Sequence, residues 1–131
     1  MRLVVDASVV IQVALTARGA ARLASHDLFA PPLLASEITS TLSEMAHRRE
    51  LPADVARQAM VAAHALPVAF RRPSALHERA WDLARTLGWA KTYDAEYVAL
   101  AQMLDMPLLT IDERLRRGVG DLVALPAPTE L

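Results

Sequence analysis

Short apolar runs alternate along this chain with longer segments of helical periodicity, and this alternation restricts the possible folds more than any other sequence feature. The runs lie at residues 3–5, 28–30, 68–70 and 108–111. Their length and their aliphatic side chains are typical of buried strands. Strands that alternate with helices form parallel sheets covered on both faces. We therefore predict an α/β fold with a central parallel sheet.

The segments between these runs carry helix signals. Ser8 and Asp94 stand where helix caps are common, and Gly88 marks a C-terminal stop. A last short strand is predicted at 122–124, followed by an extended tail at 126–131. The predicted helices span residues 7–15, 20–25, 33–49, 52–65, 75–87 and 94–104.

The bulk composition fits one intracellular domain. A length of 131 residues suits a single domain over 1–131. Cysteine is absent, so disulfides and thiolate metal sites are excluded, as is usual in a reducing compartment. The first residues reach the charge of Asp6 too early for a signal peptide, and no apolar run approaches the ~20 residues of a membrane helix. We expect a cytoplasmic protein without membrane segments.

Charge and aromatic content do not by themselves indicate a nucleic-acid binder. The formal net charge is −1, and aromatic residues make up 5% of the chain. A protein of this composition is not expected to depend mainly on base stacking. Trp81 and Trp89 flank the end of one predicted helix, and we expect them to serve core or dimer packing.

Four acidic residues stand at positions where a parallel sheet gathers functional groups. Asp6 and Asp112 follow predicted strands, Asp94 opens a helix, and Glu37 lies early in another helix. Taken singly, each has an ordinary explanation as a helix cap or a solvated residue. Because functional groups collect at the carboxyl ends of parallel strands, a doubly wound sheet can bring all four to one cleft.

Clustered carboxylates repel one another unless a cation neutralises them. With oxygen ligands and neither cysteine nor paired histidines, the hard ions Mg²⁺ and Mn²⁺ are favoured. Such ions activate water and stabilise a phosphoryl group during transfer. The acids therefore indicate phosphodiester hydrolysis.

Three blocks resemble the acidic motifs of PIN-domain proteins. They are Val-Val-Asp-Ala-Ser at 4–8, Tyr-Asp-Ala-Glu-Tyr-Val-Ala-Leu-Ala at 93–101 and Leu-Thr-Ile-Asp-Glu-Arg-Leu at 109–115. Pro-Leu-Leu at 32–34, followed by Glu37, is similar to the segment that carries the helical acid of the family. The resemblance covers most of the chain in the right order, and the Tyr-Asp-Ala block is its most specific part.

Within that family, the size and layout most resemble the VapC-type toxins of bacterial toxin–antitoxin pairs. The resemblance implies a three-layer α/β/α sandwich and an endoribonuclease that depends on Mg²⁺ or Mn²⁺. It also implies a homodimer inhibited by a small antitoxin, which inserts into an apolar groove beside the active site. RNA is the implied substrate.

The resemblance also assigns roles to single residues. The side chains implied to hold the metal and the attacking water are those of Asp6, Glu37, Asp94 and Asp112. Ser8 and Thr110 are implied to orient these carboxylates. Ser40 stands where the family often has asparagine, and its shorter side chain is a departure from the family pattern. The candidates for binding the RNA backbone are Lys91, Arg114 and Arg116.

Other functions remain open at this point. A phosphatase that uses Asp6 as nucleophile is one, although the second aspartate that such enzymes place two residues later is Ser8 here. A PIN-fold nuclease that processes RNA without an antitoxin is another. A third is an interaction module that has kept the fold and lost catalysis, which should tolerate Asp94→Asn without loss of function.

Overall fold

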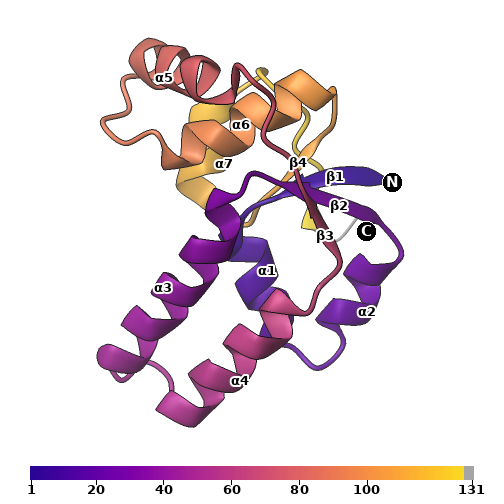
Figure 1. The fold of residues 1–131 in the computed structure, drawn as a ribbon, viewed down its shortest axis with the longest axis vertical. Helices are drawn as coiled ribbons and strands as arrows, with labels where there is room; N and C mark the ends of the chain where they lie inside the picture. Colours follow the sequence, from indigo (N-terminus) through magenta and orange to yellow (C-terminus); the bar gives the residue numbers. More distant parts are fainter. Residues whose placement is uncertain (129–131) are drawn as a thin grey trace.

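The computed structural model describes residues 1–128, and the chain folds there into a parallel sheet flanked by helices (Figure 1). The elements in chain order are β1 (Arg2–Val5), α1 (Ala7–Ala14), α2 (Gly19–Ala24), β2 (Asp27–Ala30), α3 (Leu33–His47), α4 (Ala53–His64), β3 (Val68–Phe70), α5 (Leu76–Leu87), α6 (Tyr93–Leu104), β4 (Leu108–Leu109) and α7 (Glu113–Val119).

The sheet has the strand order β3-β2-β1-β4, and every neighbouring pair is parallel. Figure 1 shows α1, α2, α3 and α4 on one side of the sheet and α5, α6 and α7 on the other. The α/β fold with a central parallel sheet is therefore confirmed. Because β1 lies between β2 and β4, the chain reverses direction across the sheet at β1, where parallel sheets place their ligand sites.

The core explains why these segments form these elements. Leu3, Val4 and Val5 of β1 are fully buried, since helices cover both faces of the sheet. Helix α6 packs against β1 and β4 and is buried from Ala95 to Ala101. An element buried on all sides carries apolar side chains all round, and this composition distinguishes α6 from the amphipathic helix α5.

Four of the five predicted strands are present in the structure, one of them shorter than predicted. The predicted strand 108–111 ends at Leu109, and the predicted strand at 122–124 is wrong. Only one backbone bond joins this last segment to the sheet in the described residues, from the Leu108 N–H to the Ala124 carbonyl at 2.9 Å. The next carbonyls, at Leu125 and Pro126, accept from Arg116 instead of from a strand. Residues 126–127 of the predicted tail lie in neither a helix nor a strand, and residues 129–131 lie outside the described range.

Two helix caps differ from the prediction. Asp6, not Ser8, caps α1, since its carboxylate accepts from the Val9 N–H. Helix α6 begins at Tyr93, so Asp94 lies inside its first turn and does not cap it. Gly88 ends α5 in the left-handed region, with φ 74°, as predicted. No helix in the described part of the chain is long and apolar enough to cross a membrane.

Candidate active site

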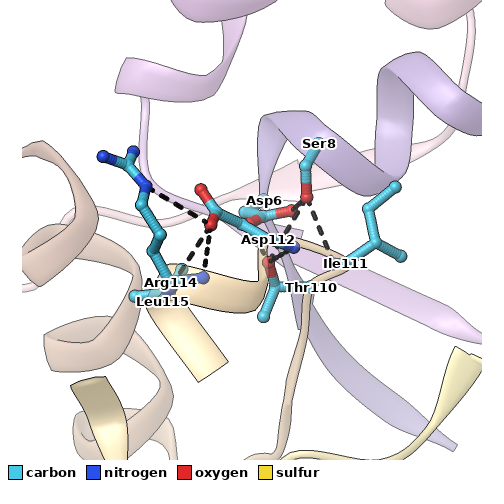
Figure 2. Close-up of polar contacts among 7 residues, drawn as sticks. All are labelled: Asp6, Ser8, Thr110, Ile111, Asp112, Arg114 and Leu115. Carbon is cyan, nitrogen blue, oxygen red and sulfur yellow. Dashed lines mark hydrogen bonds and ion pairs between the residues drawn. The ribbon is translucent and has the colours of Figure 1, made fainter. Parts of the chain in front are cut away.

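The candidate site lies at the carboxyl edge of the two central strands. Asp6 follows β1 directly, and Thr110 and Asp112 follow β4. Because β1 and β4 pair in parallel, with Val5 opposite Leu109, the segments after them leave the sheet side by side. Figure 2 shows Asp6 and Thr110 pointing toward each other, with Asp112 beside them.

Asp6 is held in a fixed position by its neighbours. The residue is 5% exposed, and its carboxylate accepts hydrogen bonds from the Ser8 hydroxyl at 2.6 Å, the Val9 N–H at 3.2 Å and the Thr110 hydroxyl. Ser8 and Thr110 also lie 3.3 Å apart, oxygen to oxygen. The structure thus contains the hydroxyl contacts to Asp6 that we expected, while their effect on a metal stays a prediction.

Asp112 is tied to the same group through its backbone. Its N–H donates to the Thr110 hydroxyl oxygen at 3.1 Å, so Thr110 contacts both acids (Figure 2). Its Oδ1 caps α7 by accepting from the N–H groups of Arg114 and Leu115, at 2.9 and 3.3 Å. Asp112 is therefore a helix cap, which is the ordinary role considered for it from the sequence. Its Oδ2 accepts no hydrogen bond from any described residue.

Glu37 and Asp94 come from helices on opposite sides of the sheet. Glu37 of α3 accepts a hydrogen bond from the hydroxyl of Tyr97, a residue of α6 that is 1% exposed. Asp94 makes no side-chain hydrogen bond with any described residue. Both acids line one cleft, whose walls are Glu37, Trp89, Lys91, Tyr93, Asp94, Arg114 and Leu115.

The acids are close enough to affect one another's ionisation. Burial raises the pKa of Asp6, Glu37 and Asp94 above the ordinary values, and this is the largest effect for each. The charge of Asp94 adds to the rise in the pKa of both Asp6 and Glu37, and the charge of Asp112 adds to that of Asp94. Arg114 acts in the opposite direction on Asp94. All four acids thus share one electrostatic site.

The donor set fits a hard divalent cation in its chemistry. Its free oxygens in the described structure are those of Asp94, the Oδ2 of Asp112 and the Oε2 of Glu37, and carboxylate oxygens are what Mg²⁺ and Mn²⁺ prefer. The described side chains do not, however, form a ready-made cage, since no three of the Asp, Glu and His residues among them converge to coordinating distance. A bound cation would therefore draw the carboxylates together.

The electrostatics predict a pH effect on the metal-free protein. Because the pKa of Asp6, Glu37 and Asp94 is raised, the folded state binds more protons than the unfolded state. The free energy of unfolding should thus fall as pH rises from the ordinary values, 3.8 for Asp and 4.5 for Glu, through the raised folded ones. Urea unfolding in EDTA at several pH values measures this fall. It should be smaller in Asp94→Asn, and equal slopes in both proteins would show that the cluster does not titrate as described.

Ser40 and Arg116 differ from the other predicted site residues, because in the described structure they neither line the cleft nor hydrogen-bond to a carboxylate of the four acids. Ser40 lies one turn along α3 from Glu37, is exposed, and lines a separate hollow with Thr39 and His64. The guanidinium of Arg116 donates to the carbonyls of Thr110, Leu125 and Pro126, at 3.0 to 3.3 Å. Arg116 thus anchors residues 125–126 beside the segment that follows β4, and a contact of Arg116 with RNA stays a prediction.

Four residues in or beside the cleft were not predicted as part of the site. Trp89, Tyr93 and Leu115 line the cleft, and Tyr97 contacts Glu37. A signal for Tyr97 existed in the sequence, because it stands three residues after Asp94 and so shares its helix face. The partner of that face, Glu37, lies 60 residues away and could not be identified from spacing.

The chain matches a known protein family over most of its length. The profile described as PIN domain matches residues 3–120. A relative named VapC ribonuclease Mb0985, from Mycobacterium bovis, is 40% identical over 115 residues, which cover 86% of this chain and 87% of the relative.

Solved structures share the fold. PAE2754 from Pyrobaculum aerophilum superposes with a TM-score of 0.72 at 21% identity, covering 99% of this chain and 86% of that one. VapBC2 from Rickettsia felis, solved bound to a DNA fragment from its promoter, gives 0.65 at 9% identity, covering 96% and 98%. At these identities the likeness concerns the fold alone.

Proposed function

Because the chain belongs to the PIN domain family and its relatives include VapC-type ribonucleases, we propose that it is the endoribonuclease toxin of a VapBC-type toxin–antitoxin pair and depends on Mg²⁺ or Mn²⁺. The observation that carries this proposal is the cleft in which Asp94 faces Glu37, with Asp6 and Asp112 coupled to it. We take residues 1–131 as one PIN-like domain that acts in the cytoplasm.

We assign the binding of the cation to the four acids, and the orientation of one of these acids to two hydroxyl side chains. Glu37, Asp94 and Asp112 present free oxygens to a cation, and Asp6 adds its buried charge behind them. When bound, a divalent cation lowers the pKa of a water molecule and neutralises charge on the phosphoryl group. Ser8 and Thr110 hold the Asp6 carboxylate in one orientation, which fixes where that charge lies.

Positive side chains in the same cleft suit the RNA backbone. Lys91 and Arg114 line the cleft, and the side chain of Arg114 is 83% exposed. Its Nε lies 3.9 Å from Asp112 Oδ1, too long for a firm ion pair, so the guanidinium can turn toward a phosphate. We propose that both cations hold the strand whose phosphate faces the acids.

Arg114 and Arg116 form a matched pair for testing this assignment. We expect Arg114→Ala to weaken RNA binding and to lower the slope of log affinity against log salt by about one, with an unchanged melting temperature. Arg116→Ala should instead lower the free energy of unfolding by about 2 kcal/mol, because its charged hydrogen bonds anchor 125–126. Filter binding across a salt series and thermal melts measure the two effects. Weaker RNA binding by Arg116→Ala together with a lower stability of Arg114→Ala would show that the two arginines have the opposite roles.

The antitoxin and the second subunit are proposals drawn from the relatives. A hollow lined mainly by apolar side chains lies between α1, α2 and the end of β4, bordered by Val9, Val13, Leu23, Leu109 and Ile111. Ile111 precedes Asp112, so the hollow begins beside the acids. We propose that a small cognate antitoxin inserts an apolar segment here, and that the toxin is a homodimer.

Incubation of the purified protein with total cellular RNA tests the function. We expect discrete fragments in Mn²⁺ and none in EDTA. Intact RNA under both conditions, with a folded protein free of antitoxin, would instead favour the non-catalytic interaction module.

A further inference from the structure

Two aromatic side chains line the cleft beside the acids. Tyr93 immediately precedes Asp94 at the start of α6, and its side chain is 51% exposed. Trp89 lies in the same cleft wall, half-buried. Tyr93 is thus one of the large hydrophobic side chains that stay exposed in the described part of the chain.

Trp89 is held rigidly in that wall. Its backbone N–H donates to the Ala84 carbonyl at 2.8 Å, and its backbone carbonyl accepts from the guanidinium of Arg85 at 2.6 Å. Its indole rests against α7 at Gly118, where a Cβ atom would approach the ring to 2.9 Å. Trp89 also packs against the hydrophobic core, as the sequence predicted, so its ring forms a fixed surface of the cleft.

We propose that Tyr93 and Trp89 form a stacking site for one unpaired nucleobase next to the scissile phosphate. This inference rests on the proposed function. Base faces stack on aromatic rings without regard to sequence, and Lys91 and Arg114 lie in the same cleft to hold the adjoining phosphates.

A paired base does not fit this site. In a duplex each base is covered above and below by its neighbours, so only a base turned out of the stack offers a free face. The aromatic side chains lie beside Asp94 and Glu37, where the phosphate must approach. A loop or a single strand meets both requirements at once.

Trp81 provides a control on the same molecule. It is 60% exposed on α5, and Arg85 covers its ring at 5.2 Å from the centroid. It borders a different hollow, together with His77, Glu78 and Asp82. An exposed tryptophan outside the cleft should not affect RNA binding.

The test measures binding without cleavage, in the Asp94→Asn background with EDTA. The probes are a short fluorescein-labelled RNA of mixed sequence, the same strand in a duplex, and a ribose-phosphate chain of equal length without bases. Fluorescence anisotropy measures the affinity of each probe for the background protein and for three variants of it, which carry Tyr93→Ala, Tyr93→Phe or Trp81→Ala in addition. Tyr93→Ala should weaken binding of the single strand roughly 5- to 150-fold, the range for loss of one base stack.

Tyr93→Phe and Trp81→Ala should bind the single strand with the affinity of the background protein. The duplex and the chain without bases should bind weakly, and Tyr93→Ala should not change their affinity. Equal binding of the single strand by Tyr93→Ala and the background would overturn the stacking site. Equal binding of single strand and duplex by the background would also overturn it. Tyr93-dependent binding together with no cleavage by the parent protein in Mn²⁺ would support the stacking site while rejecting the nuclease.

Discussion

The Asp94→Asn variant should cleave RNA at least about 100-fold more slowly than the parent protein while keeping its fold. Substitutions at the partners of metal ligands already cost about 10–100-fold, and Asp94 is proposed as a ligand itself. Among the described residues its carboxylate makes no side-chain hydrogen bond, so the isosteric amide removes charge without breaking a contact. Because Asp112 repels Asp94, we expect a melting temperature in EDTA equal to or above that of the parent protein.

A matched acid on the surface controls for general charge effects. Asp82 is exposed on α5, outside the cleft, and Asp82→Asn should cleave RNA at the parent rate. Both variants are purified identically, which also reveals any contaminating nuclease. Cleavage by Asp94→Asn within a few-fold of the parent rate would contradict the assignment of Asp94 to the metal.

Mn²⁺ should raise the melting temperature of the parent protein by roughly 10 °C when its free concentration is about 100-fold above Kd. Binding to the folded state alone adds about 2.7 kcal/mol under that condition. Burial, and to a lesser extent repulsion between the acids, raises the pKa of Asp6, Glu37 and Asp94, and the cation relieves the repulsion. Differential scanning fluorimetry in Mn²⁺ and in EDTA measures the shift.

The same pair of variants shows where the metal binds. Asp94→Asn should lose most of the Mn²⁺ shift, whereas Asp82→Asn should keep it. Asp6→Ala is less informative, because Asp6 caps α1 and its loss costs about 1 kcal/mol in addition to any metal effect. A parent protein that melts at one temperature with and without Mn²⁺ would remove the metal site from the account.

Local patterns predicted most of the fold. The β-branched run before Asp6 and the short apolar segment before Pro31 are strands in the structure, because side-chain period and burial are properties of neighbouring residues. The alternation of strands and helices then predicted the parallel sheet. The parallel sheet in turn predicted that Asp6 and Asp112 lie at one edge.

What the sequence could not predict depends on contacts between distant residues. The segment 122–124 has strand-forming side chains, yet Arg116 binds the carbonyls that follow it and no ladder forms. Arg114 and Arg116 are two residues apart in one helix, and the sequence does not show that Arg114 is exposed in the cleft while Arg116 binds backbone carbonyls. The bond from Tyr97 to Glu37 and the exposure of Tyr93 beside the acids likewise appear only once α3 and α6 meet.

The most direct test of the account is the return of activity when metal is restored. The protein is stripped with EDTA and then given Mn²⁺ in excess, and the cleavage rate of a labelled RNA is measured before and after. We expect no cleavage in EDTA and a return to the original rate in Mn²⁺ for the parent protein, with no return for Asp94→Asn. Cleavage that continues in EDTA, or that returns equally in both proteins, would contradict an active site built on these four acids.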